Sequence, residues 1–192
     1  MRVSRQKAAE NRERIIEAAG ALFREKGFDR VGVADIMKAA DLTHGGFYGH
    51  FESKDDLTAQ ASERAMTRAA TNWGKIVADA PNDPYAALLK HYLSRRHRDD
   101  PGQGCAFAAL SGDAARCGTR VRTAFAEGLE RLIEIVAKTV PSRSKAVRRR
   151  RAVAAVAELV GALILSRAVE DSSLSDEILD SARHELLDAA GR

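Results

Sequence analysis

Apolar residues recur at three- and four-residue spacing along almost the whole chain, and no segment shows the alternation that is typical of a half-buried β-strand. The first such segment, 11–26, places Ile15, Ala19 and Phe23 on one face, and Gly27 follows as a helix stop. Together with only 4 prolines in 192 residues, this pattern predicts an all-α fold of about nine helices. The expected helices cover residues 11–26, 33–40, 44–51, 53–79, 84–98, 105–116, 119–139, 144–170 and 175–189.

The composition is that of an ordinary soluble globular protein, with 45% apolar and 30% charged residues. Two cysteines do not make a secreted disulfide framework. Glu158 and Arg167 interrupt the most apolar stretch, 152–169, so we expect no membrane span and a cytoplasmic protein.

The formal net charge is only +4, but basic and acidic residues are unevenly distributed along the sequence. Residues 1–14 carry five basic against two acidic side chains, and residues 142–151 carry six basic and no acidic ones, while 170–188 is acidic. The N-terminal arm suits phosphate or minor-groove binding as well as a solvated tail. For 142–151 we expect a solvated face that pairs with 170–188 across antiparallel helices.

Residues 27–57 have the organisation of a helix-turn-helix unit. A short helix over 33–40 is followed by a tight turn at Asp41 and Leu42, and Thr43 is suited to begin the next short helix. Such a unit presents the polar start of its last helix to the DNA major groove.

The string GFDRVGVADIMKAADLTHGGFYGHFESKDDL, residues 27–57, resembles the DNA-binding domain of the TetR/AcrR family of bacterial transcriptional regulators. The resemblance implies a helix-turn-helix DNA-binding domain over 1–52 and an effector-binding and dimerisation domain over 53–192. It is carried by Gly27, Phe28, Val33, Asp35, Ile36, Ala40, Thr43, Tyr48, His50, Phe51, Ser53, Lys54 and Leu57. The implied function is a homodimeric repressor that binds a pseudo-palindromic double-stranded operator and is released by a small-molecule effector.

Three positions depart from the family pattern. Gly32 stands where the family has Ser or Thr, so one phosphate contact is lost. Asp41 replaces a glycine, and Asp tolerates the left-handed conformation that the turn needs. Met37 replaces an alanine and needs extra room in the packing.

The resemblance assigns phosphate contacts to four side chains whose chemistry suits that role. These are Thr43, Tyr48, His50 and Lys54. Of the residues that open the reading helix, only His44 can hydrogen-bond a base edge. We hypothesise that Gly45 and Gly46 let the backbone approach the groove closely, so that specificity depends on His44, thymine contacts and DNA shape.

If the family pattern holds, the helices between residues 60 and 140 enclose the effector, and the scarcity of aromatics favours a small or aliphatic one. The candidate lining residues are Met66, Trp73, Tyr92, Cys105, Phe107, Leu110, Phe125 and Leu129. The string GCAFAALSGDAARCG, 104–118, resembles a family subgroup in which Gly-Cys opens the sixth helix. Cys105 and Cys117 make a redox- or electrophile-sensing regulator the alternative, against two buried thiols without such a role.

The last two long helices are, by resemblance, the dimer interface. Their candidate interface residues are Val153, Val156, Val160, Leu163, Ile164, Ile178 and Leu186.

Two further classes of protein remain as alternatives. A cysteine-dependent enzyme would need Cys105 with His91 or His97 as its base, but no residue is identified that orients either histidine, and no metal-ligand spacing is present. A structural chromatin protein would bind DNA without an effector. We expect a non-enzymatic regulator without a cofactor.

Overall fold

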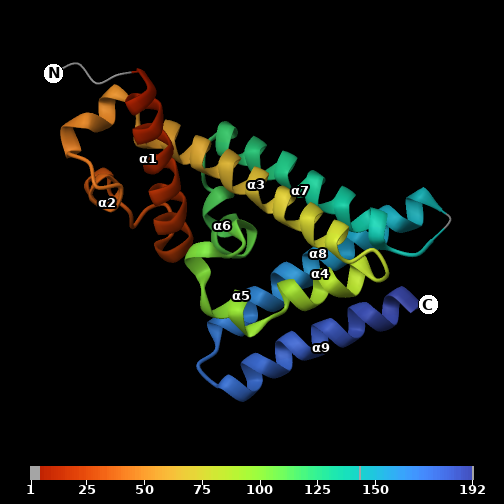
Figure 1. The fold of residues 1–192 in the computed structure, drawn as a ribbon. Coiled ribbons are helices and arrows are strands. Elements are labelled where there is room, and N and C mark those ends of the chain that lie inside the picture. Colours follow the sequence, from red (N-terminus) through yellow and green to blue (C-terminus); the bar gives the residue numbers. More distant parts are fainter. Residues whose placement is uncertain (1–4, 143, 192) are drawn as a thin grey trace.

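The computed structural model describes residues 5–142 and 144–191, and within these ranges the chain is helical without strands, which confirms the predicted fold class. Figure 1 shows the arrangement of the helices. The α-helices are α1 (Arg5–Lys26), α2 (Val33–Ala39), α3 (Lys54–Asp79), α4 (Pro84–Tyr92), α5 (Arg95–Asp99), α6 (Ala106–Ala114), α7 (Thr119–Thr139), α8 (Lys145–Ala168) and α9 (Ser172–Gly191), and the 3₁₀ segments are η1 (His44–Gly49) and η2 (Pro101–Gln103). None of the described helices combines the length and apolarity that crossing a bilayer requires.

The N-terminal elements α1, α2 and η1 form a small head at one end of the molecule (Figure 1). Its core includes Ile15, Phe23, Ile36 and Phe47, each at most 1% exposed. Burial of such side chains stabilises the head by about 1.5–3 kcal/mol each. The predicted apolar face of the first helix is therefore the face that packs here.

Local capping signals set several helix boundaries. Gly27 ends α1 with a φ of +82°, a left-handed conformation that glycine adopts without strain. Ser53 begins α3 by accepting a hydrogen bond from the Asp56 amide at 3.0 Å, and Asp83 begins α4 in the same way. Asp41 has a φ of +54°, so it takes the left-handed turn conformation expected of it.

Several elements differ from the prediction, and α1 already begins at Arg5, six residues before the expected start at residue 11. The helix expected over 84–98 is broken after Leu93, because Ser94 caps a new helix by accepting the His97 amide hydrogen bond at 3.2 Å. The last helix begins at Ser172, three residues early, because the Asp171 carboxylate caps it. The third helix of the head is a 3₁₀ segment.

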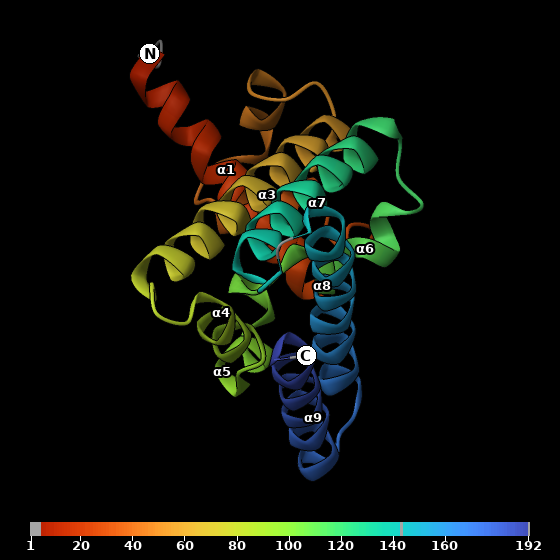
Figure 2. The same ribbon diagram turned by 90° about the vertical axis from the view of Figure 1, so that its right-hand side faces the viewer.

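The long helices α3 and α7 run side by side along the body, with α8 and α9 adjacent to one another on the far side (Figures 1 and 2). Gly128 of α7 faces Met66 of α3, which is fully buried. A Cβ at residue 128 would lie 2.6 Å from Met66 Cγ and 2.7 Å from its Cβ. Glycine is therefore required for this close helix approach.

We predict that Gly128→Ala destabilises the protein by about 1–3 kcal/mol, because the clash involves atoms near the Met66 backbone and α3 must shift. Gly74→Ala is the matched control in α3, where a Cβ would meet nothing within 4 Å, and it should be neutral or stabilise by up to about 1 kcal/mol. Urea unfolding measures both changes. Equal stabilities for the two variants would contradict the close approach.

Candidate nucleic-acid interface and effector cleft

The polar start of η1 is held at the surface by the apolar residues of the head. Phe47 is fully buried, and its ring packs edge-on against Tyr48 at 5.2 Å between centroids. Before η1, the Gly32 amide donates to the Asp35 carboxylate at 3.0 Å, which caps α2 in place of a side chain at residue 32. This packing presents one side of η1 to solvent.

The residues predicted to contact DNA differ in how far they are exposed to solvent. Tyr48 is 72% exposed, and Thr43 and His44 are also exposed. Thr43 occupies the N-cap position of η1, but its hydroxyl makes no capping hydrogen bond and is free to donate elsewhere. His50 is half-buried, and its ring lies near Phe51.

Lys54, for which a phosphate contact is predicted, makes a hydrogen bond within the protein. Its ammonium donates to the Phe28 carbonyl at 2.7 Å, within the head. The Phe28 amide in turn donates to the Asp113 carboxylate of α6 at 3.0 Å. Lys54 therefore helps to fix the link between α1 and α2 rather than standing free.

The glycines of η1 are not required by packing. A Cβ at Gly45 would meet nothing within 4 Å, and one at Gly46 would lie 3.7 Å from Met37 Cε. Met37 is buried beneath this position, so the room it needs is found under η1. Packing inside the head does not require glycine at residue 45, so any requirement for glycine there comes from the solvent-exposed side of η1.

A second site is a cleft of about 990 Å³ lined by α1, α3, α4 and the segment that leads into α6. We call it the α1–α3–α6 cleft. Of the predicted effector-lining residues it contains Trp73, Tyr92 and Cys105. Trp73 and Tyr92 pack edge-on at 5.4 Å between ring centroids.

The other five predicted lining residues lie outside this cleft. Met66 is enclosed between α3 and α7, and Leu129 is 37% exposed on α7. Phe107 and Phe125 pack on each other at 5.4 Å between ring centroids, with Leu110 buried in the same core. Helical spacing identified these residues as inward-facing, but four of them fill the core and Leu129 is exposed.

His97 holds the start of α6 in place. Its Nδ1 lies 2.8 Å from the Tyr92 carbonyl, and its Nε2 accepts the Cys105 amide hydrogen bond at 3.0 Å. Burial lowers the pKa of His97, which keeps this ring neutral and able to accept. Both ring nitrogens are thus bonded to backbone groups, so His97 is not positioned as a base for the Cys105 thiol.

The two cysteines are free thiols in different surroundings. Cys105 lies at the N-cap of α6 and lines the cleft. Cys117 lies beyond α6, and burial, followed by the charge of Asp113, raises its pKa. A higher pKa means less thiolate, so the thiol-sensing alternative rests on Cys105.

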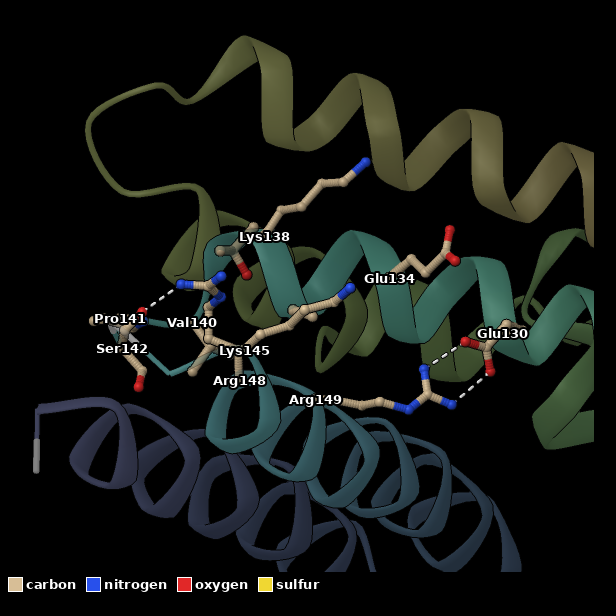
Figure 3. Close-up of a pocket in the computed structure, with 11 residues that line it drawn as sticks. Glu130, Glu134, Lys138, Val140, Pro141, Ser142, Lys145, Arg148 and Arg149 are labelled. Carbon is tan, nitrogen blue, oxygen red and sulfur yellow. Dashed lines mark hydrogen bonds and ion pairs between the residues drawn. The ribbon is translucent and has the colours of Figure 1, made fainter.

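A third cavity, of about 1140 Å³, lies where α7 meets α8 and contains part of the basic run (Figure 3). Arg149 donates two hydrogen bonds to the Glu130 carboxylate, one of them 2.8 Å long. Arg148 donates to the Ser142 carbonyl at 2.5 Å. The run therefore makes local contacts. Within the subunit, Asp176 of α9 forms ion pairs with Arg95 and Arg98 of α5. The expected pairing was with residues 142–151.

The predicted dimer-interface residues divide between two sides of α8 and α9. Val156, Leu163 and Leu186 are buried in the subunit's own core, so they are withdrawn from the interface. Val160 and Ile178 are half-buried, whereas Val153 and Ile164 are exposed. Large apolar side chains that the prediction omitted are also exposed here, namely Leu165, Leu174 and Leu187.

The sequence prediction also missed the charged residues of the cleft. Arg24 of α1 and Arg68 of α3 both line it. Apolar spacing indicates only apolar lining residues, whereas arginines on the polar faces of two amphipathic helices have the pattern of solvated residues. Of the basic N-terminal arm, Arg2 lies outside the described residues, and α1 already begins at Arg5.

A three-element head with an exposed, polar recognition segment, mounted on a long helical body, defines the class of helix-turn-helix proteins. Residues 15–61 match the family described as bacterial regulatory proteins, tetR family. The repressor DhaR of a Mycobacterium strain, GP1, is 29% identical over 112 residues, which are 58% of this chain and 56% of that protein. The regulator AcrR of Shigella flexneri is 32% identical over 87 residues, covering 45% of this chain and 40% of the relative.

Solved structures resemble the chain over nearly its whole length. The reduced form of Escherichia coli NemR has a TM-score of 0.78 at 19% identity and covers 92% of this chain and 95% of its own. A TetR-family regulator from Cytophaga hutchinsonii has a TM-score of 0.75 at 24% identity and covers 97% of both chains. The family match thus covers residues 15–61, and the solved structures show that the chain shares their fold over nearly its whole length. The chain spans about half the length of the curated relatives that it matches.

Proposed function

We propose that this protein is a dimeric transcriptional regulator, most simply a repressor, that releases operator DNA when a small molecule occupies the α1–α3–α6 cleft. In this proposal residues 1–52 bind DNA, and residues 53–192 bind the effector and dimerise. The observation that carries it is the exposed polar face of η1, with Tyr48 72% exposed beside the free hydroxyl of Thr43. The relative DhaR is named a transcriptional repressor, which supports repression over activation.

A physical connection between the cleft and the head supports effector-controlled release. The start of α6 lines the cleft through Cys105 and Ala106, and its other end holds the head through Asp113. A Cβ at Gly27 would lie 2.7 Å from the Asp113 carboxylate, so this glycine also lets the two parts meet. A ligand that displaces α6 would shift the head, and DNA and ligand would weaken each other's binding equally.

We predict that Tyr48→Phe weakens DNA binding about two- to tenfold, because it removes one phosphate hydrogen bond and leaves the exposed ring in place. The duplex is selected from a random library with the full-length protein, and affinity is then measured by fluorescence anisotropy at fixed salt. Tyr85→Phe, in buried surroundings on α4, is the control and should bind as the unmodified protein does. Failure to enrich any duplex would overturn the proposed function.

We predict that Gly45→Ala and Gly46→Ala each reduce affinity and specificity for the selected duplex, because the added methyl groups keep the backbone away from the groove. The free protein should be equally stable or gain up to about 1 kcal/mol per substitution, since both Cβ positions have space. Gly112→Ala on α6 adds a methyl group in open space elsewhere and serves as the control. Unchanged affinity in both η1 variants would refute the close-approach hypothesis.

We predict that Ile164→Glu weakens the dimer at least about a hundredfold, because it places a carboxylate on the exposed apolar face of α8 that a second subunit would cover. Analytical ultracentrifugation over a dilution series measures the change. Leu129→Glu, at an equally exposed apolar residue of α7, should leave the dimer intact. A monomeric unmodified protein, or a dimer insensitive to Ile164→Glu, would contradict this interface.

A further inference from the structure

The α1–α3–α6 cleft has two arginines that converge on the same short segment. Arg24 Nε donates to the Gly102 carbonyl of η2 at 2.8 Å, and Arg68 Nη2 donates to the Gln103 side chain at 3.0 Å. These contacts use neutral oxygen acceptors, so they orient the guanidiniums without neutralising them. Two cationic groups from different helices are thereby fixed at one end of the cleft.

Neither guanidinium has a carboxylate partner. Among the described residues, no acidic side chain lies within 4.0 Å of a charged nitrogen of Arg24 or Arg68, although Arg64 in the same cleft pairs with Glu13. With Arg64 paired, Glu17 is the one acidic side chain in the described lining, set against Arg24, Arg68 and Lys75. The cleft is therefore a site of net positive charge.

The guanidinium charges of Arg24 and Arg68 also repel each other. Burial lowers the pKa of Arg24, and the neighbouring charge of Arg68 lowers it further, whereas Cys105, Glu25 and Asp100 act in the opposite direction. The Asp100 carboxylate is occupied in capping η2, where it accepts the Gln103 amide hydrogen bond at 3.2 Å. A bound anion would relieve the repulsion between the guanidiniums and would form charge-assisted hydrogen bonds with them.

Tyr92 supplies a second, independent observation at the inner part of the cleft. Its side chain is 1% exposed, and in the described part of the chain its buried hydroxyl has no nitrogen or oxygen partner and interacts only with the Cys105 thiol, which is a weak acceptor. A buried hydroxyl normally has an acceptor. Tyr92, Cys105 and Arg24 all line the cleft, and Cys105 influences the pKa of both Tyr92 and Arg24, so the buried hydroxyl and the guanidinium belong to the same region of the cleft.

We propose that the effector is a small organic carboxylate, whose oxygens bind Arg24 and Arg68 and accept the Tyr92 hydroxyl proton in a hydrogen bond. One carboxylate provides both of the groups that the cleft lacks, a negative charge and an acceptor. Its apolar part lies along the wall formed by Ala65, Ala69 and Trp73. This inference rests on the effector-binding half of the proposed function and is independent of DNA recognition.

The test compares three probes with the same chain and different head groups, namely octanoate, octan-1-ol and octylamine. Trp73, the only tryptophan in the sequence, lines the cleft, so its fluorescence reports occupancy directly. Octanoate should bind at least about tenfold more tightly than the alcohol or the amine, because only the carboxylate pairs with the guanidiniums. Equal binding of the three probes, or preference for the amine, overturns the proposal.

Matched variants locate the head group. Arg68→Gln should weaken octanoate about tenfold without changing octan-1-ol, while Arg64→Gln, at the arginine already paired with Glu13, should change octanoate less than about twofold. Tyr92→Phe should weaken octanoate several-fold with little change in the melting temperature of the free protein, because there the hydroxyl interacts only with a thiol, a weak acceptor. Full octanoate affinity in both Arg68→Gln and Tyr92→Phe overturns the proposal.

The selected duplex separates this inference from the proposed function. Octanoate binding that displaces the duplex supports both. Intact duplex binding without any octanoate binding overturns the carboxylate inference alone, and octanoate binding by a protein that enriches no duplex overturns the regulatory function alone.

Discussion

The close approach of α3 to α7 at Gly128 is the constraint on which the other sites depend. With no side chain at residue 128, Met66 packs directly against the α7 backbone, and α3 is held rigidly along its middle. The same helix begins in the head, where Lys54 bonds the Phe28 carbonyl, and reaches Trp73 in the cleft. The single helix α3 thus provides residues to both candidate sites, so the position of each site depends on it.

In the proposed release of DNA, the shorter helix α6 makes the contact that changes. Phe28 is held by its carbonyl to α3 and by its amide to Asp113 of α6, so the link between α1 and α2 has one attachment to the rigid helix and one to the helix that borders the cleft. A hydrogen bond to a charged group contributes about 1.5–3 kcal/mol. Typical allosteric coupling free energies are about 1–3 kcal/mol, so loss or retention of this one bond has the right magnitude for regulation.

The features that could be predicted from the sequence are those set by neighbouring residues. Ser53 and Asp83 cap helices because their acceptors and amides are three residues apart, and the head follows from a motif of 31 residues. The bond from Lys54 to Phe28 joins residues 26 apart and depends on the packed head. Apolar spacing likewise does not distinguish a residue that faces its own core, such as Leu163, from one that faces outward, such as Ile164.

Basic charge shows most clearly why composition could not locate the sites. The densest basic run, residues 142–151, says least about where a ligand binds, because Arg149 pairs with Glu130 and Arg148 donates to the Ser142 carbonyl. Arg24 and Arg68 lie 44 residues apart and attract no attention in the sequence, yet the fold brings both onto η2 without a carboxylate. A binding site is indicated by charge that the fold leaves unpaired and partly desolvated, and that property exists only after α1 and α3 have packed.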